Sequence, residues 1–317
     1  MPETILIATR SFGSTSNKPW EVLAEAGLEV RRADMAVAAT EDGLIDLLQG
    51  MDGAIIGVVP MTRRVLTNAP GLKVVSMHGV GCDHVDIAAA REFGIIVANT
   101  PGANDQAVAD LTIGLIVAAA RNIPQADEDL RQENWGRYSG SELWNKTLGL
   151  VGYGRIGRGV ARRALGFDMQ VLVYDPYIPP EALGLPGVTL TSFEEVLTQA
   201  DFLSLHAVLT AETAKMIGAV QLEKMKPGAY LINTARGGLV DEDALYQALS
   251  AGKIAGAALD VFVNEPPKGS PLLKLQNVVL TPHIGAHTKE AVERMGVLAA
   301  RNVAQALRTG EPLFRVG

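Results

Sequence analysis

Three charged side chains in the second half of the chain, Arg236, Glu265 and His283, each follow a short apolar run. An arginine guanidinium can donate two parallel hydrogen bonds to a carboxylate. An imidazole exchanges protons near neutral pH, and an adjacent carboxylate raises its pKa and orients the ring. Beside a nicotinamide ring, these three groups are what hydride transfer to a 2-oxo acid requires. Taken singly, each residue also fits a structural role in a solvated loop, at a strand end or in a turn.

A glycine pattern lies upstream of these residues, where Gly152, Gly154 and Gly157 separate an apolar run from an Ala/Arg-rich helical segment. Gly152 allows a tight turn, Gly154 lets the backbone approach a pyrophosphate, and Gly157 lets helix and strand pack closely. The N–H groups of a helix that begins near Arg155 would hold the phosphates. The chain has 33 glycines, so the spacing alone is a weak signal. The flanking strand and helix favour a dinucleotide site over a structural turn.

Asp175 ends the second apolar run, 23 residues beyond Gly152. A carboxylate at this position accepts hydrogen bonds from the ribose hydroxyls of a dinucleotide and repels a 2′-phosphate. Neither Pro176 nor Tyr177 supplies a compensating cation. The sequence therefore predicts NAD as the cofactor rather than NADP.

The elements that position these residues alternate between strand and helix along the whole chain. In the first part, strands are expected at residues 4–9, 52–59, 72–77 and 95–98, with helices that include 19–26, 44–48 and 87–93. Further strands are expected at 202–205, 230–233, 257–261 and 278–280. Such alternation predicts an α/β fold with parallel sheets covered by helices on both faces.

Two domains are expected, one inserted into the other. The turn-rich stretch 99–104 separates a first unit from the glycine pattern, and only one helix, 289–308, remains after the last strand. A single helix cannot form a domain, so it must pack on an earlier one. The expected domains are 1–98 plus 286–317 and 99–285. The two crossings between them would form a hinge, with a ligand in the cleft.

Composition excludes several classes of function. The net charge of −7 argues against binding to nucleic acid or to an acidic membrane surface. The longest apolar run, near 113–120, is shorter than the roughly 20 residues of a membrane span. No basic segment precedes the first apolar residues, so no signal peptide is expected. The one cysteine, Cys82, excludes an internal disulfide and fits a reducing cytoplasm.

A metal site is not expected, although His78, Cys82, Asp83 and His84 lie close together in the sequence. The two histidines are six residues apart, and no second pair stands at ligand spacing. His78 is instead expected to tune a substrate pocket, and Cys82 to pack as a small side chain.

These motifs resemble the D-isomer-specific 2-hydroxyacid dehydrogenase family over essentially the whole chain. The carrying segments are 152–157, 233–238, 259–266 and 282–285, with 29 residues from Arg236 to Glu265 and 18 more to His283. The resemblance implies an NAD-binding Rossmann domain inserted into a flavodoxin-like substrate-binding domain. It implies that Arg236 binds the substrate's carboxylate and carbonyl, that His283 exchanges the proton, and that Glu265 pairs with His283. It also implies a substrate-binding loop with Gly79, Val80 and Gly81.

The resemblance further implies which residues contact the cofactor. Arg155 and Ile156 would lie on the pyrophosphate, and Asp260 would reach the nicotinamide amide. The implied set is Gly152, Gly154, Arg155, Ile156, Gly157, Asp175, His206, Ala207, Val208, Thr213, Thr234, Ala235, Arg236, Asp260, His283 and Gly285.

The substrate's side chain is less well specified. Around the substrate loop and 99–105, the chain is most similar to members called phosphoglycerate dehydrogenases. Several of those have an arginine before the loop to meet a phosphate, where this chain has Met77, and many append a regulatory domain that has no counterpart here. Val208 replaces a frequent proline and His287 a small residue. The expected substrate is a small 2-hydroxy or 2-oxo acid, with phosphorylated (3-phosphoglycerate), sulfonated and plain side chains as alternatives.

An alternative function is an NAD(H)-sensing, corepressor-like interaction protein, because the family includes corepressors that keep the fold. The intact set of arginine, glutamate and histidine argues against a role in binding alone.

A homodimer is also expected. The helix 106–121 and the aromatic segment 135–144 correspond to the family's dimer contact, so the 105–145 region would form the interface. The alternative is that this helix belongs to the core of one chain.

Overall fold

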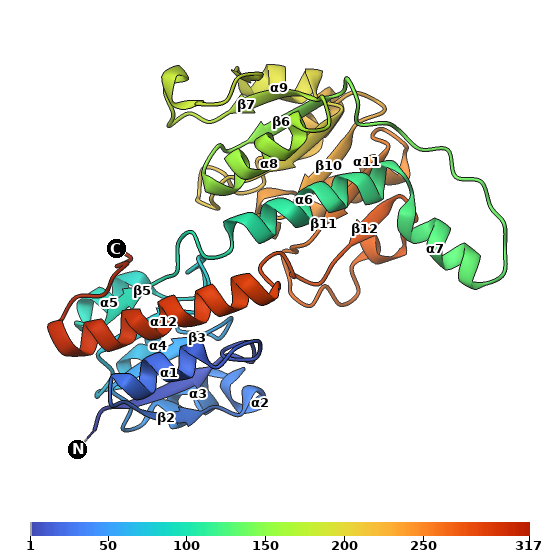
Figure 1. The fold of residues 1–317 in the computed structure, drawn as a ribbon. Coiled ribbons are helices and arrows are strands. Elements are labelled where there is room, and N and C mark those ends of the chain that lie inside the picture. Colours follow the sequence, from blue (N-terminus) through green and yellow to red (C-terminus); the bar gives the residue numbers. More distant parts are fainter. Residues whose placement is uncertain (1) are drawn as a thin grey trace. The chain divides into compact units, whose positions relative to one another are not determined.

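The computed structural model describes residues 2–317, which form two compact units. One contains the chain up to Asn104 together with Ala286–Gly317, and the other contains Asp105–Gly285 (Figure 1). Each unit has its own sheet, its own helices and its own buried core.

The first unit is built on a five-stranded parallel sheet with the order β2-β1-β3-β4-β5. Its strands are β1 (Thr4–Ala8), β2 (Glu29–Arg32), β3 (Gly53–Ile56), β4 (Val74–Met77) and β5 (Ile96–Ala98). Its helices are α1 (Lys18–Glu25), α2 (Met35–Ala38), α3 (Glu41–Leu48), α4 (Arg63–Thr67), α5 (Ile87–Glu92) and α12 (Lys289–Thr309). This strand order is the flavodoxin-like one, with its topological switch point between β1 and β3.

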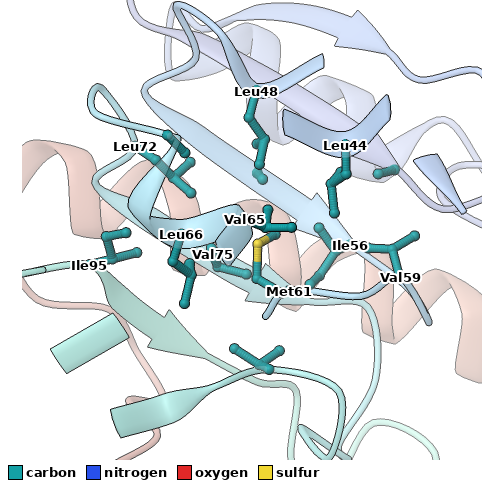
Figure 2. Packing of buried hydrophobic residues seen from close by; sticks show 14 of the residues in the cluster. Leu44, Leu48, Ile56, Val59, Met61, Val65, Leu66, Leu72, Val75 and Ile95 are labelled. Atoms are coloured by element: carbon teal, nitrogen blue, oxygen red, sulfur yellow. The ribbon is translucent and has the colours of Figure 1, made fainter. Parts of the chain in front are cut away.

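Side chains on the two faces of this sheet enter two different cores. Figure 2 shows one of them, in which Leu44, Leu48 and Val65 from the helices pack over Ile56 and Val75 of the strands. The neighbouring strand residues, Ile55 and Val74, point to the opposite face and join the core beneath α1 and α12. Because β3 and β4 are buried on both faces, their sequences are largely apolar, with Ser76 of β4 as the one polar residue.

Helix α12 returns from the second unit and packs against α1, β3 and β4. Thr288 caps its first turn by accepting a hydrogen bond from the Ala291 N–H. The fully buried Asn302 donates to the Asn99 carbonyl and accepts from the Phe314 N–H. The helix therefore completes the core of the first unit and also fixes the backbone at the end of β5.

The second unit is built on a seven-stranded parallel sheet with the order β12-β11-β10-β9-β6-β7-β8. Its strands are β6 (Thr147–Val151), β7 (Gln170–Tyr174), β8 (Val188–Leu190), β9 (Phe202–Leu205), β10 (Tyr230–Asn233), β11 (Gly256–Leu259) and β12 (Val278–Leu280). Its helices are α6 (Asp105–Ala120), α7 (Ile123–Arg131), α8 (Arg155–Leu165), α9 (Phe193–Gln199), α10 (Ala219–Lys224) and α11 (Glu242–Ser250). The predicted α/β class with two parallel sheets is confirmed.

Helices cover both faces of this second sheet. The core beneath α6 and α8 contains Ile116, Val160 and Leu148, whereas the core beneath α9, α10 and α11 contains Leu197 and Leu222. Two edge strands, β2 and β8, were not predicted. All four residues of β2, Glu-Val-Arg-Arg, are exposed, so this strand has no apolar alternation for a sequence to show.

Of the residues that the structure describes, no single helix is long and apolar enough to cross a membrane. Helices α6 and α7 reach the required length and composition only when they are taken together, and the chain bends by 65° between them.

Candidate active site

The predicted residues of the second unit all lie at the carboxyl ends of its parallel strands. In sheet order, Asp175 follows β7, the glycine turn follows β6 and His206 follows β9. Arg236 then follows β10, and His283 follows β12. The chain changes direction between β6 and β9, and this topological switch point is where open parallel sheets bind ligands.

The glycine turn at β6 has the geometry that its sequence predicts. Gly152 has φ +97, and a Cβ there would lie 2.6 Å from the His206 carbonyl carbon. A Cβ on Gly157 would lie 2.4 Å from the Gly152 carbonyl oxygen, so helix α8 packs close to the turn. Gly154 precedes the first residue of α8, and nothing lies within 4 Å of the position of its Cβ. The start of α8 is therefore open to a phosphate, whose charge the helix dipole favours.

Both carboxylate oxygens of Asp175 accept backbone hydrogen bonds. Oδ2 accepts from the Tyr153 N–H at 2.8 Å, and Oδ1 accepts from the Tyr177 N–H at 3.0 Å. The carboxylate is thereby fixed beside the glycine turn, and each oxygen keeps a lone pair for a further donor.

The segment after β9 contains the predicted residues His206, Ala207, Val208 and Thr213. The His206 Nε2 lies 2.9 Å from the Ser204 hydroxyl, and burial lowers the pKa of this imidazole to about 4. It is therefore neutral at physiological pH. The Thr213 hydroxyl donates to the Val208 carbonyl at 2.7 Å, which shapes the loop and leaves the Val208 side chain exposed.

The loop after β10 carries Arg236 close to the end of β11. A Cβ on Gly237 would lie 2.0 Å from the Phe262 carbonyl carbon, so only glycine permits this approach of the two loops. The Thr234 hydroxyl lies 2.9 Å from that of Thr112, a fully buried residue of α6. Arg236 itself donates to the Ala235 carbonyl at 2.6 Å.

Glu265 and His283 form an ion pair, with 2.7 Å between Glu265 Oε2 and His283 Nδ1. The other Glu265 oxygen accepts from the Phe262 N–H at 3.1 Å, which fixes the carboxylate. A carboxylate can only accept, so Nδ1 is the donor in this pair. The imidazole therefore has Nε2 left to exchange a proton with a ligand.

The electrostatics of this pair suit an acid near neutral pH. The hydrogen bond that His283 donates to Glu265 is the largest influence on the imidazole and raises its pKa, against the effect of burial. Burial favours the neutral form of Glu265, but hydrogen bonds from His283 and Phe262 outweigh it and lower the pKa of the carboxyl. The charge of Arg236 lowers the pKa of both groups.

Asp260 holds the turn that carries His283. Its side chain is 1% exposed; Oδ1 accepts from the Ile284 N–H at 2.8 Å and the Thr281 hydroxyl at 2.6 Å, and Oδ2 accepts from the Gly285 N–H at 2.8 Å. Its carbonyl accepts from the His283 N–H at 2.8 Å. His283 has φ +51, a left-handed conformation that costs a non-glycine residue about 1–3 kcal/mol. These hydrogen bonds hold the His283 backbone in that conformation and so fix the position of the imidazole.

In the first unit, the loop Gly79–Gly81 follows β4. Thr100 donates to the Gly79 carbonyl from both its N–H and its hydroxyl, and the Asn99 side chain donates to the Val80 carbonyl at 2.9 Å. Among the described residues, none accepts a hydrogen bond from the N–H of Val80 or Gly81. The loop thus has the carbonyls of Gly79 and Val80 bonded and two N–H groups available to an anion.

His78 lies at the start of this loop and is 8% exposed. Its Nδ1 lies 3.3 Å from the Ser11 hydroxyl, and its ring packs edge-on against Phe12. Burial lowers the pKa of His78 to about 4. In the part of the chain that the structure describes, no group of three or more His, Cys, Asp or Glu side chains is arranged to hold a metal ion.

The 105–145 region consists of two contrasting parts. Helix α6 is largely buried within the second unit, under α8 and over β10 to β12. Helix α7 has no buried residue, and the segment 132–142 after it has no helix or strand. Trp135 and Trp144 are 83% and 61% exposed, an unusual state for tryptophan.

Sequence reasoning missed several residues that shape these loops, among them Asn99, Thr100, Thr112 and Asn302. Each uses its side chain to hold backbone or another hydroxyl. The one available signal is an Asn or Thr directly after a predicted strand, where its side chain commonly closes a turn.

Comparisons with known proteins agree with this geometry. Residues 113–285 match the family described as "D-isomer specific 2-hydroxyacid dehydrogenase, NAD binding domain". A D-3-phosphoglycerate dehydrogenase of Methanocaldococcus jannaschii is 46% identical over 284 residues, which cover 88% of this chain and 54% of that protein. A glyoxylate reductase of Thermococcus litoralis is 44% identical over 270 residues, 82% of each chain. The crystal structure of the TT0316 protein from Thermus thermophilus has a TM-score of 0.89 and 40% identity, and covers 99% of this chain and 100% of that one.

The chain spans about half the length of the D-3-phosphoglycerate dehydrogenases that it matches. It spans most of the glyoxylate reductase and all of the Thermus thermophilus protein. The unit Asp105–Gly285 is an NAD(P)-binding domain, because the family match lies within it. The resemblance predicted from the motifs is confirmed, and the chain belongs to the D-isomer specific 2-hydroxyacid dehydrogenase family.

Proposed function

We propose that the protein is an NAD-dependent D-2-hydroxyacid dehydrogenase, which interconverts a small 2-oxo acid and the corresponding 2-hydroxy acid. The observation that supports this most strongly is the Glu265–His283 pair, 2.7 Å apart, beside the charge of Arg236 and on the same sheet edge as the glycine turn. A proton donor, an anion-binding guanidinium and a dinucleotide site are the groups that the reaction needs.

In the direction of reduction, Arg236 binds the substrate's carboxylate and carbonyl oxygen, and the N–H groups of Val80 and Gly81 donate to the carboxylate. The hydride that reduces the keto carbon would come from NADH when that cofactor is bound. His283 donates the proton on Nε2 to the carbonyl oxygen, and Glu265 stabilises the imidazolium that precedes the transfer. The balance is one 2-oxo acid, one NADH and one proton giving one 2-hydroxy acid and one NAD⁺. Oxidation runs through the same groups in reverse.

The residues of the second unit fit a dinucleotide. The open Cβ position of Gly154 leaves room for a pyrophosphate at the start of α8, beside Arg155 and Ile156. The loops with His206–Val208, Thr213, Thr234 and Ala235 line the same edge, and Asp260 and Gly285 lie next to His283.

NAD is proposed over NADP because the Asp175 carboxylate is fixed at the end of β7 by two backbone N–H groups. An anion held in place would accept hydrogen bonds from ribose hydroxyls and repel a 2′-phosphate. Titrations of the protein's fluorescence with NADH and NADPH test this, and equal or tighter binding of NADPH would contradict it.

The function is tested by the loss of NADH absorbance with a panel of 2-oxo acids that have phosphorylated, sulfonated and plain side chains. His283→Asn should reduce turnover by roughly 10²–10⁴-fold, the usual contribution of general acid–base catalysis. Asparagine is chosen because it tolerates the left-handed backbone at this position. NADH binding without turnover of any oxo acid would instead favour the NAD(H)-sensing role.

We also propose a homodimer that forms through the 105–145 region. Support comes from α7, which has no fully buried residue, and from the exposed Leu130, Trp135 and Trp144. Several large exposed apolar side chains in one segment are typical of an interface. Light scattering after size exclusion should give twice the chain mass, and Trp135→Ser with Leu130→Ser should shift the protein towards monomer. A monomeric wild-type protein would refute the proposal.

A further inference from the structure

Asn233 is the last residue of β10, and its side chain makes hydrogen bonds to the backbone of the loop that carries Arg236. It is 1% exposed. Its Oδ1 accepts a hydrogen bond from the Ala235 N–H at 3.1 Å, and its Nδ2 donates to the Arg236 carbonyl at 2.9 Å. This is a side-chain-closed turn, in which the amide replaces hydrogen bonds that a continuing strand would have made. The backbone on both sides of the Arg236 nitrogen is thus held by one buried residue.

The same residue is linked to the turn that carries His283. The Asn233 carbonyl accepts from the Asp260 N–H at 3.0 Å, and the Asp260 carbonyl accepts from the His283 N–H at 2.8 Å. The Asp260 carboxylate holds the N–H groups of Ile284 and Gly285. Two buried polar side chains at adjacent strand ends, Asn233 and Asp260, therefore connect the backbone of Arg236 to that of His283.

Asparagine is the residue that this position needs. Its amide has an acceptor for Ala235 and a donor for Arg236, whereas aspartate has only acceptors and alanine has neither. The alternatives open to the loop are few, because a Cβ on Gly237 would already lie 2.0 Å from the Phe262 carbonyl carbon. Loss of the amide would leave the partly buried Ala235 N–H and Arg236 carbonyl without this partner, and the loop would shift to reach other partners.

We propose that Asn233 is a positioning residue, which aims the Arg236 guanidinium at the substrate's carboxylate and sets its spacing from His283 through Asp260. This inference rests on the dehydrogenase function proposed above and adds to it a residue that touches neither substrate nor cofactor. A displaced guanidinium weakens substrate binding and the alignment for hydride transfer, and it leaves the dinucleotide site at β6 and β7 unchanged.

The test compares Asn233→Ala and Asn233→Asp with the wild-type protein. Both variants should lose on the order of 10²-fold in kcat/KM for the oxo acid, the effect of a small misplacement of a catalytic group. Both should bind oxamate, a carboxylate analogue, correspondingly less tightly in calorimetry of the NADH-loaded protein. The dissociation constant of NADH should rise much less than that of oxamate, because the glycine turn and Asp175 stay in place. The pH dependence of reduction should shift far less than in Glu265→Gln, because Glu265 still pairs with His283.

Asn277→Ala is the matched control. Asn277 lies just before β12, at the amino ends of the strands, whereas Asn233 lies at the carboxyl ends. The Asn277 side chain donates to the Leu249 and Ala255 carbonyls at 3.4 and 3.3 Å. It should lose stability without losing oxamate affinity. If Asn233→Ala does not fold, Asn233→Ser, whose hydroxyl can replace one of the two hydrogen bonds, should show an intermediate loss.

Three outcomes are decisive. If the wild-type protein reduces an oxo acid and the variants at position 233 keep both its kcat/KM and its oxamate affinity, this inference is overturned but the proposed function is not. An equal loss of oxamate affinity in Asn277→Ala would also overturn the inference, because the effect would then be one of general stability. A wild-type protein that turns over no oxo acid would overturn the proposed function and this inference with it.

Discussion

At the scale of single residues, His283 combines a left-handed backbone with a carboxylate partner, and both features have consequences. Hydrogen bonds that Asp260 accepts from this turn hold the left-handed backbone, and Glu265 stabilises the charge of the imidazolium. The pair keeps the imidazole protonated to higher pH than a free histidine, which is the form that reduction of an oxo acid requires.

Glu265→Gln should therefore change the pH dependence of reduction. Without the carboxylate, the pKa of His283 falls, so kcat/KM for the oxo acid should begin to decrease at a lower pH than in the wild type. Oxidation of the hydroxy acid needs the neutral imidazole, and its rise with pH should shift in the same direction. Profiles of kcat/KM against pH in both directions measure this. Glu242→Gln, which alters a neighbouring carboxylate bonded to the Val263 N–H, should leave both profiles unshifted.

His78 should make the first unit less stable in acid. Its pKa falls from 6.5 to about 4 on folding, so the unfolded chain takes up a proton at a pH where the folded one does not. Stability should thus be unaffected above pH 6.5 and should decrease by about 1.4 kcal/mol per pH unit between 6.5 and about 4. Urea unfolding at a series of pH values measures the slope. His78→Gln should reduce the slope, and equal slopes in the two proteins would be incompatible with a buried neutral His78.

Arg236, Glu265 and His283, the three residues proposed to act in catalysis, could be singled out in the sequence because few residue types can do such chemistry and each follows a strand. Asn99 and Asn233 could not, although each is as closely tied to a functional loop. The side-chain amides of these two residues donate hydrogen bonds to backbone carbonyls. A sequence shows that an asparagine is present but not which carbonyl its side chain contacts.

At the scale of elements, two glycines of the turn after β6 have different reasons to lack a side chain. Gly154 leaves space for a ligand, whereas Gly157 allows close packing of the fold. Gly154→Ala adds a Cβ into open space, so the melting temperature should stay close to that of the wild type while NADH affinity falls. Gly157→Ala places a Cβ 2.4 Å from the Gly152 carbonyl oxygen, so stability and NADH affinity should fall together. Thermal unfolding and NADH titration of both variants distinguish the two effects. A Gly154→Ala protein that binds NADH as the wild type does would show that the pyrophosphate lies elsewhere.

Central strands were easier to predict than edge strands for a physical reason. The central strands β9 and β10 occupy the expected ranges, because strands buried on both faces are largely apolar. The edge strand β12 was also found, because its three residues are all apolar. β2 and β8 lie at sheet edges, where exposed positions accept polar residues and the apolar pattern is lost. The short helices α2 and α4, of four and five residues, are too brief to show a helical period.

At the scale of the whole molecule, the chain leaves the first unit once and returns once. The sequence indicated this arrangement through one observation, that the helix 289–308 has no strands of its own. In the structure that helix, α12, packs on α1, β3 and β4. The second unit, Asp105–Gly285, has a complete seven-stranded sheet with a core on each face.

The segment 105–285 expressed alone should therefore fold and bind NADH, but under the proposed function it should not reduce oxo acids, because the loop proposed to bind the substrate, Gly79–Gly81, lies in the other unit. Cooperative thermal unfolding and NADH titration are the measurements, and the same segment with Gly154→Ala is the control for binding. An unfolded segment, or one with full turnover, would contradict the expectation.

The two hydrogen bonds on Asp175 have a consequence for engineering this protein to use another cofactor. Replacement of the carboxylate would be the obvious first step towards NADP, but the same carboxylate holds the Tyr153 N–H inside the glycine turn and the Tyr177 N–H beyond it. Removing the carboxylate would release the backbone of the glycine turn, which is proposed to hold the pyrophosphate. The same substitution is meant to make room for the 2′-phosphate of NADP. A successful exchange therefore needs at least two changes, one that restores an acceptor for Tyr153 and one that adds a cation after β7.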